Sequence, residues 1–195
     1  NNDNNLNNTK NTQICLFLVE SILLDALKIR GYNPGFVAGH SLGEITALYA
    51  AKVMSFENCV SLIKIRSELM SKAPTGSMAA LIGFDRETLE SLVKTKVDIF
   101  IANDNSASQV VLSGNKDTLD EISKEIKCKR FINLNVSGAF HSRFMHEPSE
   151  KFSEYLDSVT FSEPVIPVIS NASPYFSSDS AQLKQNLKKQ MCNGV

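Results

Sequence analysis

The sequence lacks the features that mark several large classes of protein. It has no tryptophan, three histidines and a formal net charge of −1, whereas a nucleic-acid-binding domain is usually clearly basic. No apolar run reaches the roughly 18 residues that a membrane span needs, because Glu20 and Asp25 interrupt the richest candidate, residues 14–27. We therefore expect no nucleic acid and no membrane among the partners, and we expect residues 14–27 to form a buried helix.

The cysteines are few and scattered. Cys15, Cys59, Cys128 and Cys192 include no Cys-x-x-Cys pair, so their spacing favours neither a zinc site nor a disulfide framework. We expect reduced thiols that pack as small apolar side chains, and we expect no metal site.

The two ends of the chain are unusual. The first eleven residues, NNDNNLNNTKN, contain seven asparagines and one hydrophobic residue, so we expect residues 1–11 to be disordered. This tract matches neither a secretory signal nor an Arg-rich transit peptide. The chain ends in QMCNGV without a helix stop signal. Both ends are typical of cuts through a longer protein.

Apolar periodicity predicts an α/β core in two parts, residues 12–75 and 137–195. The expected strands are 35–40 and 163–170, and the expected helices are 12–30, 41–53, 55–73, 141–159 and 180–191. Between the two parts, residues 76–136 follow the order β-α-β-β-α-β, which is typical of a ferredoxin-like lobe. We predict an α/β fold of the hydrolase-like kind, with a strand–nucleophile elbow–helix core and this inserted α+β subdomain.

The stretch GHSLG, from Gly39 to Gly43, lies between an expected strand and an expected helix. In that context G-x-S-x-G is typical of a nucleophile elbow, a sharp turn that presents a serine and requires small neighbours. We predict Ser41 as the nucleophile, Gly39 and Gly43 as the small neighbours, and the Leu42 N–H as a donor to a developing oxyanion. The alternative is a chance match, because the motif is short and common.

A nucleophilic serine needs a base, and the chain offers His40, His141 and His146. His40 adjoins Ser41, and adjacent side chains diverge in an elbow. His146 lies among charged residues on an expected helix, where we expect a solvated position. His141 follows small residues at a loop-to-helix junction and is the predicted general base and acid.

The group that orients His141 is open at this point. An α/β-hydrolase places an acid between the serine and the histidine in chain order. The candidates are Asp98, Asp104, Asp117 and Asp120. The alternative is that a backbone carbonyl holds the imidazole.

Arg66 lies on the expected helix 55–73, at the border of an apolar face formed by Leu62, Ile65 and Leu69. A guanidinium at the edge of a core favours a carboxylate partner, which it binds in bidentate fashion. That carboxylate can belong to a substrate. An intramolecular salt bridge, or a surface arginine whose head reaches solvent, fits the spacing equally well.

Taken together, GHSLGE, Arg66 and SGAFHS resemble the acyltransferase domains of fatty-acid and polyketide synthases, and among them the malonyl-CoA:acyl carrier protein transacylases. The similarity covers nearly everything after the Asn-rich start, with TQICLFLVES, GSMAALIGF, NDNSASQVVLSGNKD and FHSRFM in family order. It implies transfer of a malonyl group from malonyl-CoA to the phosphopantetheine thiol of acyl carrier protein, through a malonyl-serine intermediate, in fatty-acid biosynthesis. It implies no metal and no bound cofactor, because the partner carries the phosphopantetheine.

The resemblance also implies roles for single residues. Ser41 is the acylated nucleophile, His141 its base, the Leu42 amide an oxyanion donor, and Arg66 the clamp for the malonyl carboxylate. The residues implied to line the substrate cleft are His40, Asn103, Asn105 and Phe140, with Phe140 shaping the pocket against branched acyl groups. Asn103 and Asn105 are equally well explained as turn residues between two strands.

Two family segments have no match here: an early G-Q-G-S-Q stretch that supplies the second oxyanion donor, and a late V-G-P-G segment near the catalytic histidine. The resemblance therefore implies a chain truncated at both ends. Two alternatives stay open, a serine hydrolase or thioesterase and a non-catalytic fragment that binds a carrier protein. Asn-rich inserts resemble those of parasites with a relict plastid, which suggests an apicoplast-type location, with a bacterial-type cytoplasm as the alternative.

Overall fold

The computed structural model describes residues 9–136 and 138–195 and divides into two compact units. Unit 1 comprises the described residues up to Ser71 together with Glu150–Lys189, and unit 2 comprises Lys72–Ser149 and Gln190–Val195. Residues 72–75, 138–149 and 190–195, which the sequence assigned to the core, therefore group with unit 2. The domain boundaries themselves stay a prediction.

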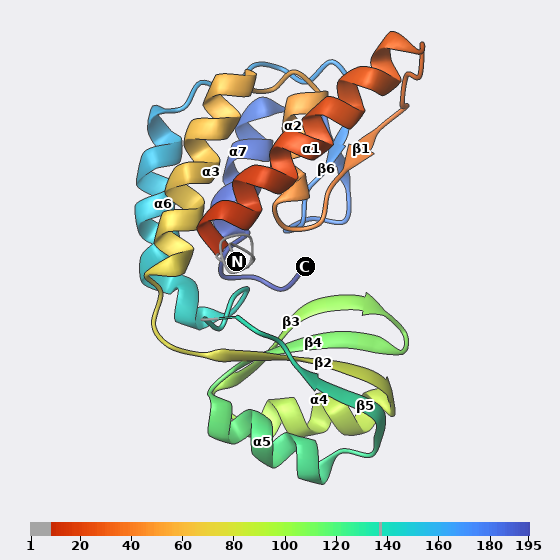
Figure 1. Ribbon diagram of the computed structural model, residues 1–195, viewed down its shortest axis with the longest axis vertical. Helices are drawn as coiled ribbons and strands as arrows, with labels where there is room; N and C mark the ends of the chain where they lie inside the picture. Colours follow the sequence, from red (N-terminus) through yellow and green to blue (C-terminus); the bar gives the residue numbers. More distant parts are fainter. Residues whose placement is uncertain (1–8, 137) are drawn as a thin grey trace, which may run out of the picture. The chain divides into compact units, whose positions relative to one another are not determined.

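Unit 1 is built mainly of helices around a small sheet (Figure 1). Its elements are α1 (Thr9–Ile29), β1 (Val37–Ala38), α2 (Gly43–Ala50), α3 (Phe56–Ser71), most of α6 (His146–Ser158), β6 (Val168–Ile169), β7 (Phe176–Ser177) and α7 (Ser180–Lys189). The sheet has the order β1-β6-β7, and β1 pairs in parallel with β6. The strands expected at 35–40 and 163–170 are thus present but only two residues long. Their parallel pairing places the chain that follows β1 beside the chain that follows β6.

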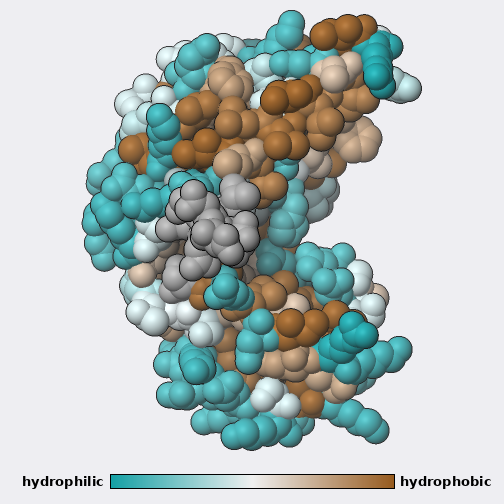
Figure 2. Space-filling model, viewed as in Figure 1, coloured by the Kyte–Doolittle hydropathy of each residue, from teal (hydrophilic) through white to brown (hydrophobic). Residues whose placement is uncertain are grey.

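Helix α1 differs from its expected burial. Only Gln13, Phe17 and Ser21 are buried, and Figure 2 shows apolar residues gathered on the surface along this helix. Its exposed apolar residues are Leu16, Leu18, Val19, Ile22, Leu23, Leu27 and Ile29. The prediction of a buried helix is therefore wrong, although no helix of the described residues is long and apolar enough to cross a membrane.

The Asn-rich start is helical in part. Residues 9–11 form the beginning of α1, so they are ordered where the sequence predicted disorder. Residues 1–8 lie outside the described part of the chain.

Unit 2 contains the predicted ferredoxin-like lobe. Its elements are β2 (Ser77–Phe84), α4 (Arg86–Thr95), β3 (Ile99–Ser106), β4 (Gln109–Gly114), α5 (Lys116–Glu125) and β5 (Cys128–Asn133), followed by a short 3₁₀ helix, η1 (Arg143–Met145). The strand order is β3-β4-β2-β5 with antiparallel neighbours, and α4 and α5 cover one face of the sheet (Figure 1). The core under these helices is formed by Ala79, Leu81, Leu89, Ile99, Val110, Leu112, Leu119, Ile122 and Ile126.

Local signals in the sequence explain this lobe. Asp85 caps α4 by accepting a hydrogen bond from the Thr88 N–H, and Asn115 caps α5 by accepting one from the Asp117 N–H. Such caps satisfy helix N–H groups that otherwise lack a partner. At the other end of the unit, Val195 hydrogen-bonds to the edge of β3, through the Ala102 carbonyl and the Asp104 N–H. This contact anchors residues 190–195 to unit 2.

Candidate active site

Ser41 lies on a sharp turn between β1 and α2. Its φ of +52° is in the left-handed region, which residues other than glycine rarely adopt. A Cβ added at Gly39 would overlap the Gly43 carbonyl, so this position requires glycine. At Gly43 an added Cβ would meet nothing within 4 Å. The expectation that both glycines are needed to make room for the turn is therefore right for Gly39 and wrong for Gly43.

The Leu42 amide is placed as an elbow requires. Leu42 precedes α2 as its N-cap residue, and its N–H donates to no acceptor among the described residues. The neighbouring amides are engaged, since Gly43 donates to the His40 carbonyl and Glu44 donates to the Ser41 carbonyl. A free N–H at a helix N-terminus can stabilise a developing negative charge.

Asn171 contacts the elbow on both sides of His40. Its Oδ1 accepts a hydrogen bond from the Ser41 N–H at 2.6 Å, and its Nδ2 donates to the Gly39 carbonyl at 2.6 Å. Its own backbone N–H donates to Glu44 Oε2 at 3.2 Å. Sequence reasoning missed this residue, because the only local signal was an asparagine at the end of a short expected strand.

Arg66 is a buried cation next to the nucleophile. Its side chain is 1% exposed, and its Nη2 donates to Ser41 Oγ at 3.0 Å. Burial lowers the pKa of the guanidinium to about 10, while the charge of Glu44, itself 0% exposed, acts in the opposite direction. Arg66 therefore stays charged at neutral pH. The alternative of a surface arginine that reaches solvent is excluded.

The position of Arg66 on its helix also differs from the expectation. The buried residues of α3 are Cys59, Leu62, Ile63, Arg66, Ser67 and Met70. Ile65 and Leu69, which the sequence placed on the apolar face, are only half-buried. Arg66 thus lies within the buried face rather than at its border.

Gln13 holds the guanidinium from the other side. Its Oε1 accepts a hydrogen bond from Arg66 Nη1 at 2.6 Å, and its Nε2 donates to Met70 Sδ at 3.2 Å. Gln13 is a buried polar residue on α1, a helix whose apolar side chains are mostly exposed. Gln13 is buried although most leucines of the same helix are exposed, because these two hydrogen bonds hold its side chain in place. Nothing in the sequence indicated this role.

In unit 2, His141 is 5% exposed and has a φ of +56°. Its Nδ1 lies 3.0 Å from the Gln190 carbonyl oxygen. Because a carbonyl only accepts, Nδ1 carries the proton in this contact, and in the neutral imidazole Nε2 then has the lone pair that a general base uses. A backbone carbonyl therefore contacts the imidazole, as one of the two alternatives proposed. Asp104, one of the candidate acids, forms a bidentate pair with Arg86.

The remaining predicted residues are divided between the units. His40 is exposed beside Ser41 in unit 1, and His146 is exposed at the start of α6, as expected. Phe140 is buried next to His141. Asn103 is buried and Asn105 exposed, and both lie within β3 rather than in the turn that follows it. Within unit 1 the structure brings together Ser41, Leu42 and Arg66. The roles of all these residues stay predictions.

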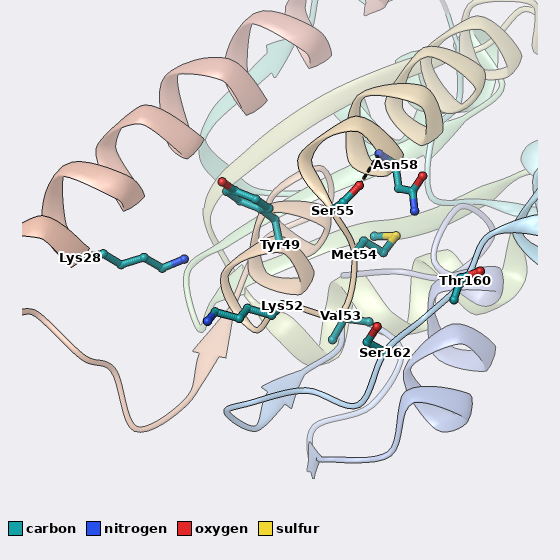
Figure 3. Close-up of a pocket in the computed structure, with 9 residues that line it drawn as sticks. All are labelled: Lys28, Tyr49, Lys52, Val53, Met54, Ser55, Asn58, Thr160 and Ser162. Carbon is teal, nitrogen blue, oxygen red and sulfur yellow. Dashed lines mark hydrogen bonds between the residues drawn. The ribbon is translucent and has the colours of Figure 1, made fainter.

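A cavity of about 450 Å³ lies elsewhere in unit 1 (Figure 3). It is formed around the ends of α1 and α2 and the beginning of α3, where Ser55 Oγ accepts a hydrogen bond from the Asn58 N–H. Its lining residues are Lys28, Tyr49, Lys52, Val53, Met54, Ser55, Asn58, Thr160 and Ser162. None of the predicted site residues is among them. Across residues 9–136 and 138–195, no cluster of histidine, cysteine and acidic side chains could hold a metal ion.

These features define an α/β protein with a serine nucleophile elbow and a ferredoxin-like lobe. The sequence model of the acyl transferase domain family matches residues 1–190. The chain is 44% identical, over 96% of its length, to a malonyl CoA-acyl carrier protein transacylase of Synechocystis, and 40% identical, over 98%, to the polyketide biosynthesis transacylase PksC of Bacillus subtilis. The chain belongs to the acyl transferase domain family, as the motifs predicted. It spans 64% of the Synechocystis relative and 68% of PksC.

Solved structures confirm the predicted fold class. The crystal structure of the Synechocystis malonyl-CoA:ACP transacylase matches with a TM-score of 0.95, over 97% of this chain and 65% of that one. A malonyl-transacylase in complex with a type II polyketide acyl-carrier protein matches at 29% identity with a TM-score of 0.92, over 99% of this chain and 66% of that one.

Proposed function

We propose that the protein transfers a malonyl group from malonyl-CoA to the phosphopantetheine thiol of an acyl carrier protein, with a malonyl ester of Ser41 as the intermediate. The observation that carries this proposal is the buried Arg66, whose guanidinium donates to Ser41 Oγ at 3.0 Å. A fixed cation beside the acylated oxygen suits an acyl group that ends in a carboxylate. A neutral acyl group such as acetyl gains nothing from it.

In the first half-reaction, Ser41 Oγ attacks the thioester carbonyl of malonyl-CoA while its proton passes to His141 Nε2. The Leu42 N–H stabilises the oxyanion, and the thiolate of CoA leaves and takes the proton from His141. His141 is thus the proposed general base and acid of this half-reaction. The hydrogen bond from Nδ1 to the Gln190 carbonyl supports this role, because it directs the lone pair to Nε2.

In the second half-reaction, the phosphopantetheine thiol attacks the malonyl-Ser41 ester. His141 removes the thiol proton and returns it to Ser41 Oγ as the ester bond breaks. Neither half-reaction, as proposed, uses a metal or a resident cofactor. The names of the relatives support the proposal, since they are malonyl CoA-acyl carrier protein transacylases, and one solved relative is bound to its carrier protein.

The test is the intact mass of the full-length protein after incubation with malonyl-CoA, beside acetyl-CoA and a Ser41→Ala control. We expect an added malonyl group on the wild type, little adduct with acetyl-CoA, and none on Ser41→Ala. Adding the holo carrier protein should then move the malonyl group to it. Release of free malonate instead of transfer would refute the transferase function and favour a hydrolase. A protein that never forms an adduct would favour the other alternative, a non-catalytic fragment that binds a carrier protein.

The location we propose is a plastid of the apicoplast type. Support comes from the Asn-rich start of the chain. Fluorescence of the tagged full-length protein in its own cell, beside a plastid marker, tests this. A signal spread through the cytoplasm would refute it.

A further inference from the structure

We propose that Asn171 is a positioning residue of this reaction, which holds the nucleophile elbow in its left-handed conformation. The inference rests on the proposed function, since it concerns the serine that is acylated there. Asn171 follows β6, and the parallel pairing of β6 with β1 places it beside the turn that follows β1. It reaches the elbow from a position 130 residues away in the sequence.

The amide side chain of Asn171 forms hydrogen bonds with the turn on both sides of His40. It accepts from the Ser41 N–H and donates to the Gly39 carbonyl, each at 2.6 Å, so that it spans the two peptide groups around His40. A residue other than glycine at a φ of +52° is strained, and such strain persists only where surrounding contacts over-determine it. Asn171 supplies such contacts.

The Asn171 backbone is fixed in turn by a buried carboxylate. Its N–H donates to Glu44 Oε2 at 3.2 Å, and Glu44 lies in the first turn of α2 with no exposed surface. Asn171 therefore links the strand end, the serine and the helix that together make the elbow. It contacts neither Arg66 nor the Leu42 N–H through any hydrogen bond found among the described residues.

The two adjacent backbone N–H groups at the elbow therefore have different roles. The Ser41 N–H is bound to Asn171, which leaves the Leu42 N–H for the oxyanion. Without Asn171, Ser41 Oγ should lose its alignment while the Arg66 guanidinium stays in place. We therefore expect a change at Asn171 to slow acylation without weakening the binding of malonyl-CoA.

The test compares Asn171→Ala and Asn171→Asp with the control Ser170→Ala in the full-length protein. Asn171→Asp keeps the shape of the side chain, so its packing survives, but it loses the N–H donor to the Gly39 carbonyl. Ser170 adjoins Asn171, is buried, and its Oγ has no hydrogen-bond partner in the described chain. Ser170→Ala is thus a buried truncation at the neighbouring position without a lost hydrogen bond.

The first readout is the rate at which a fluorophosphonate labels Ser41. In that reaction Oγ bonds to phosphorus, fluoride leaves and the serine proton passes to the base, so no malonyl group is involved. We expect labelling of Asn171→Ala to fall about 100-fold, as a misplacement of about 1 Å can cause, and labelling of Asn171→Asp to fall at least about ten-fold. Ser170→Ala should match the wild type.

The second readout is the split between kcat and KM for malonyl transfer. A positioning role predicts a loss in kcat with KM for malonyl-CoA within about two-fold of the wild type, whereas a merely structural role would lower the folded fraction and leave both constants of the folded enzyme unchanged. Wild-type labelling of either folded Asn171 variant would overturn the inference. A wild type that reacts with the fluorophosphonate but not with malonyl-CoA would refute the proposed function alone, and a wild type that reacts with neither would refute both.

Discussion

Replacing Arg66 by methionine removes a buried cation and leaves Glu44 buried without it. The fall in the Arg66 pKa from its ordinary value to about 10 corresponds to about 3 kcal/mol, at about 1.4 kcal/mol per pKa unit. This shift destabilises the folded protein: folding opposes the charged guanidinium at every pH below about 10, and the cost disappears only as the pH rises from about 10 toward the ordinary pKa of arginine. Methionine removes that cost, since it fills a similar volume without a charge.

The net effect of the substitution is nevertheless a loss of stability, because Glu44 stays buried without the opposite charge. Breaking a buried pair by removing one partner destabilises by about 3–5 kcal/mol, because the other charge is left uncompensated. We expect Arg66→Met to lower the free energy of unfolding by about 3 kcal/mol, the low end of that range, because the desolvation cost of the guanidinium is relieved. The free energy of unfolding of the double variant Arg66→Met/Glu44→Gln should lie within about 1 kcal/mol of the wild-type value. The glutamine oxygen can still accept from the Asn171 N–H.

Thermal unfolding measures these differences. A loss of about 3 kcal/mol corresponds to a fall in Tm of roughly 6–12 °C for a chain of this size, and the double variant should recover most of it. Malonyl selectivity should not recover, because both variants lack the cation that the proposed function assigns to the malonyl carboxylate. The reasoning is refuted if Arg66→Met is as stable as the wild type, or if Glu44→Gln adds no stability to it.

Three further changes test other parts of the structure. Gly39→Ala should lower Tm and Ser41 labelling strongly, because its Cβ overlaps the Gly43 carbonyl, whereas Gly43→Ala should keep the wild-type Tm; equal effects would contradict the geometry of the turn. Asp85→Ala should destabilise the protein by about 1 kcal/mol in urea unfolding, because α4 loses its cap, and an unchanged midpoint would refute the cap. Burial raises the pKa of the Cys59 thiol to about 12, so Cys59 is neutral at pH 8 and iodoacetamide should modify the exposed Cys15 in the native protein first; peptide mapping that finds Cys59 alkylated as fast would overturn this.

The sequence predicted unit 2 well because its signals are local. Strands with alternating or continuous apolar residues, and helices with a cap such as Asp85 or Asn115, fold as the pattern indicates. The short strands of unit 1 were harder. Strands β1 and β6 are two residues long, and β7, which was not predicted, is equally short. Two residues carry no periodicity.

Burial was predicted less well than secondary structure. The apolar content of α1 predicted a buried helix, yet Leu16, Ile22 and Leu23 are exposed while Gln13 is buried. Arg66 was placed at the border of the buried face of α3, but it lies within that face. Apolar content shows which side chains would be stabilised by burial, but only the packing of neighbouring elements determines which side chains are buried.

The polar contacts at the candidate site depend on the sheet rather than on any motif. The motif GHSLG could predict a serine on a turn, but it could not name the partner of its backbone, because Asn171 reaches Ser41 only through the pairing of Val37 with Val168 and of Ala38 with Ile169. A register shift of one residue would move Asn171 about 3.3 Å along β6 and turn side chains to the opposite face. The amide would then face neither the Ser41 N–H nor the Gly39 carbonyl. The conformation of the predicted nucleophile is thus set by the register of a short parallel sheet, a property that no stretch of sequence around Ser41 contains.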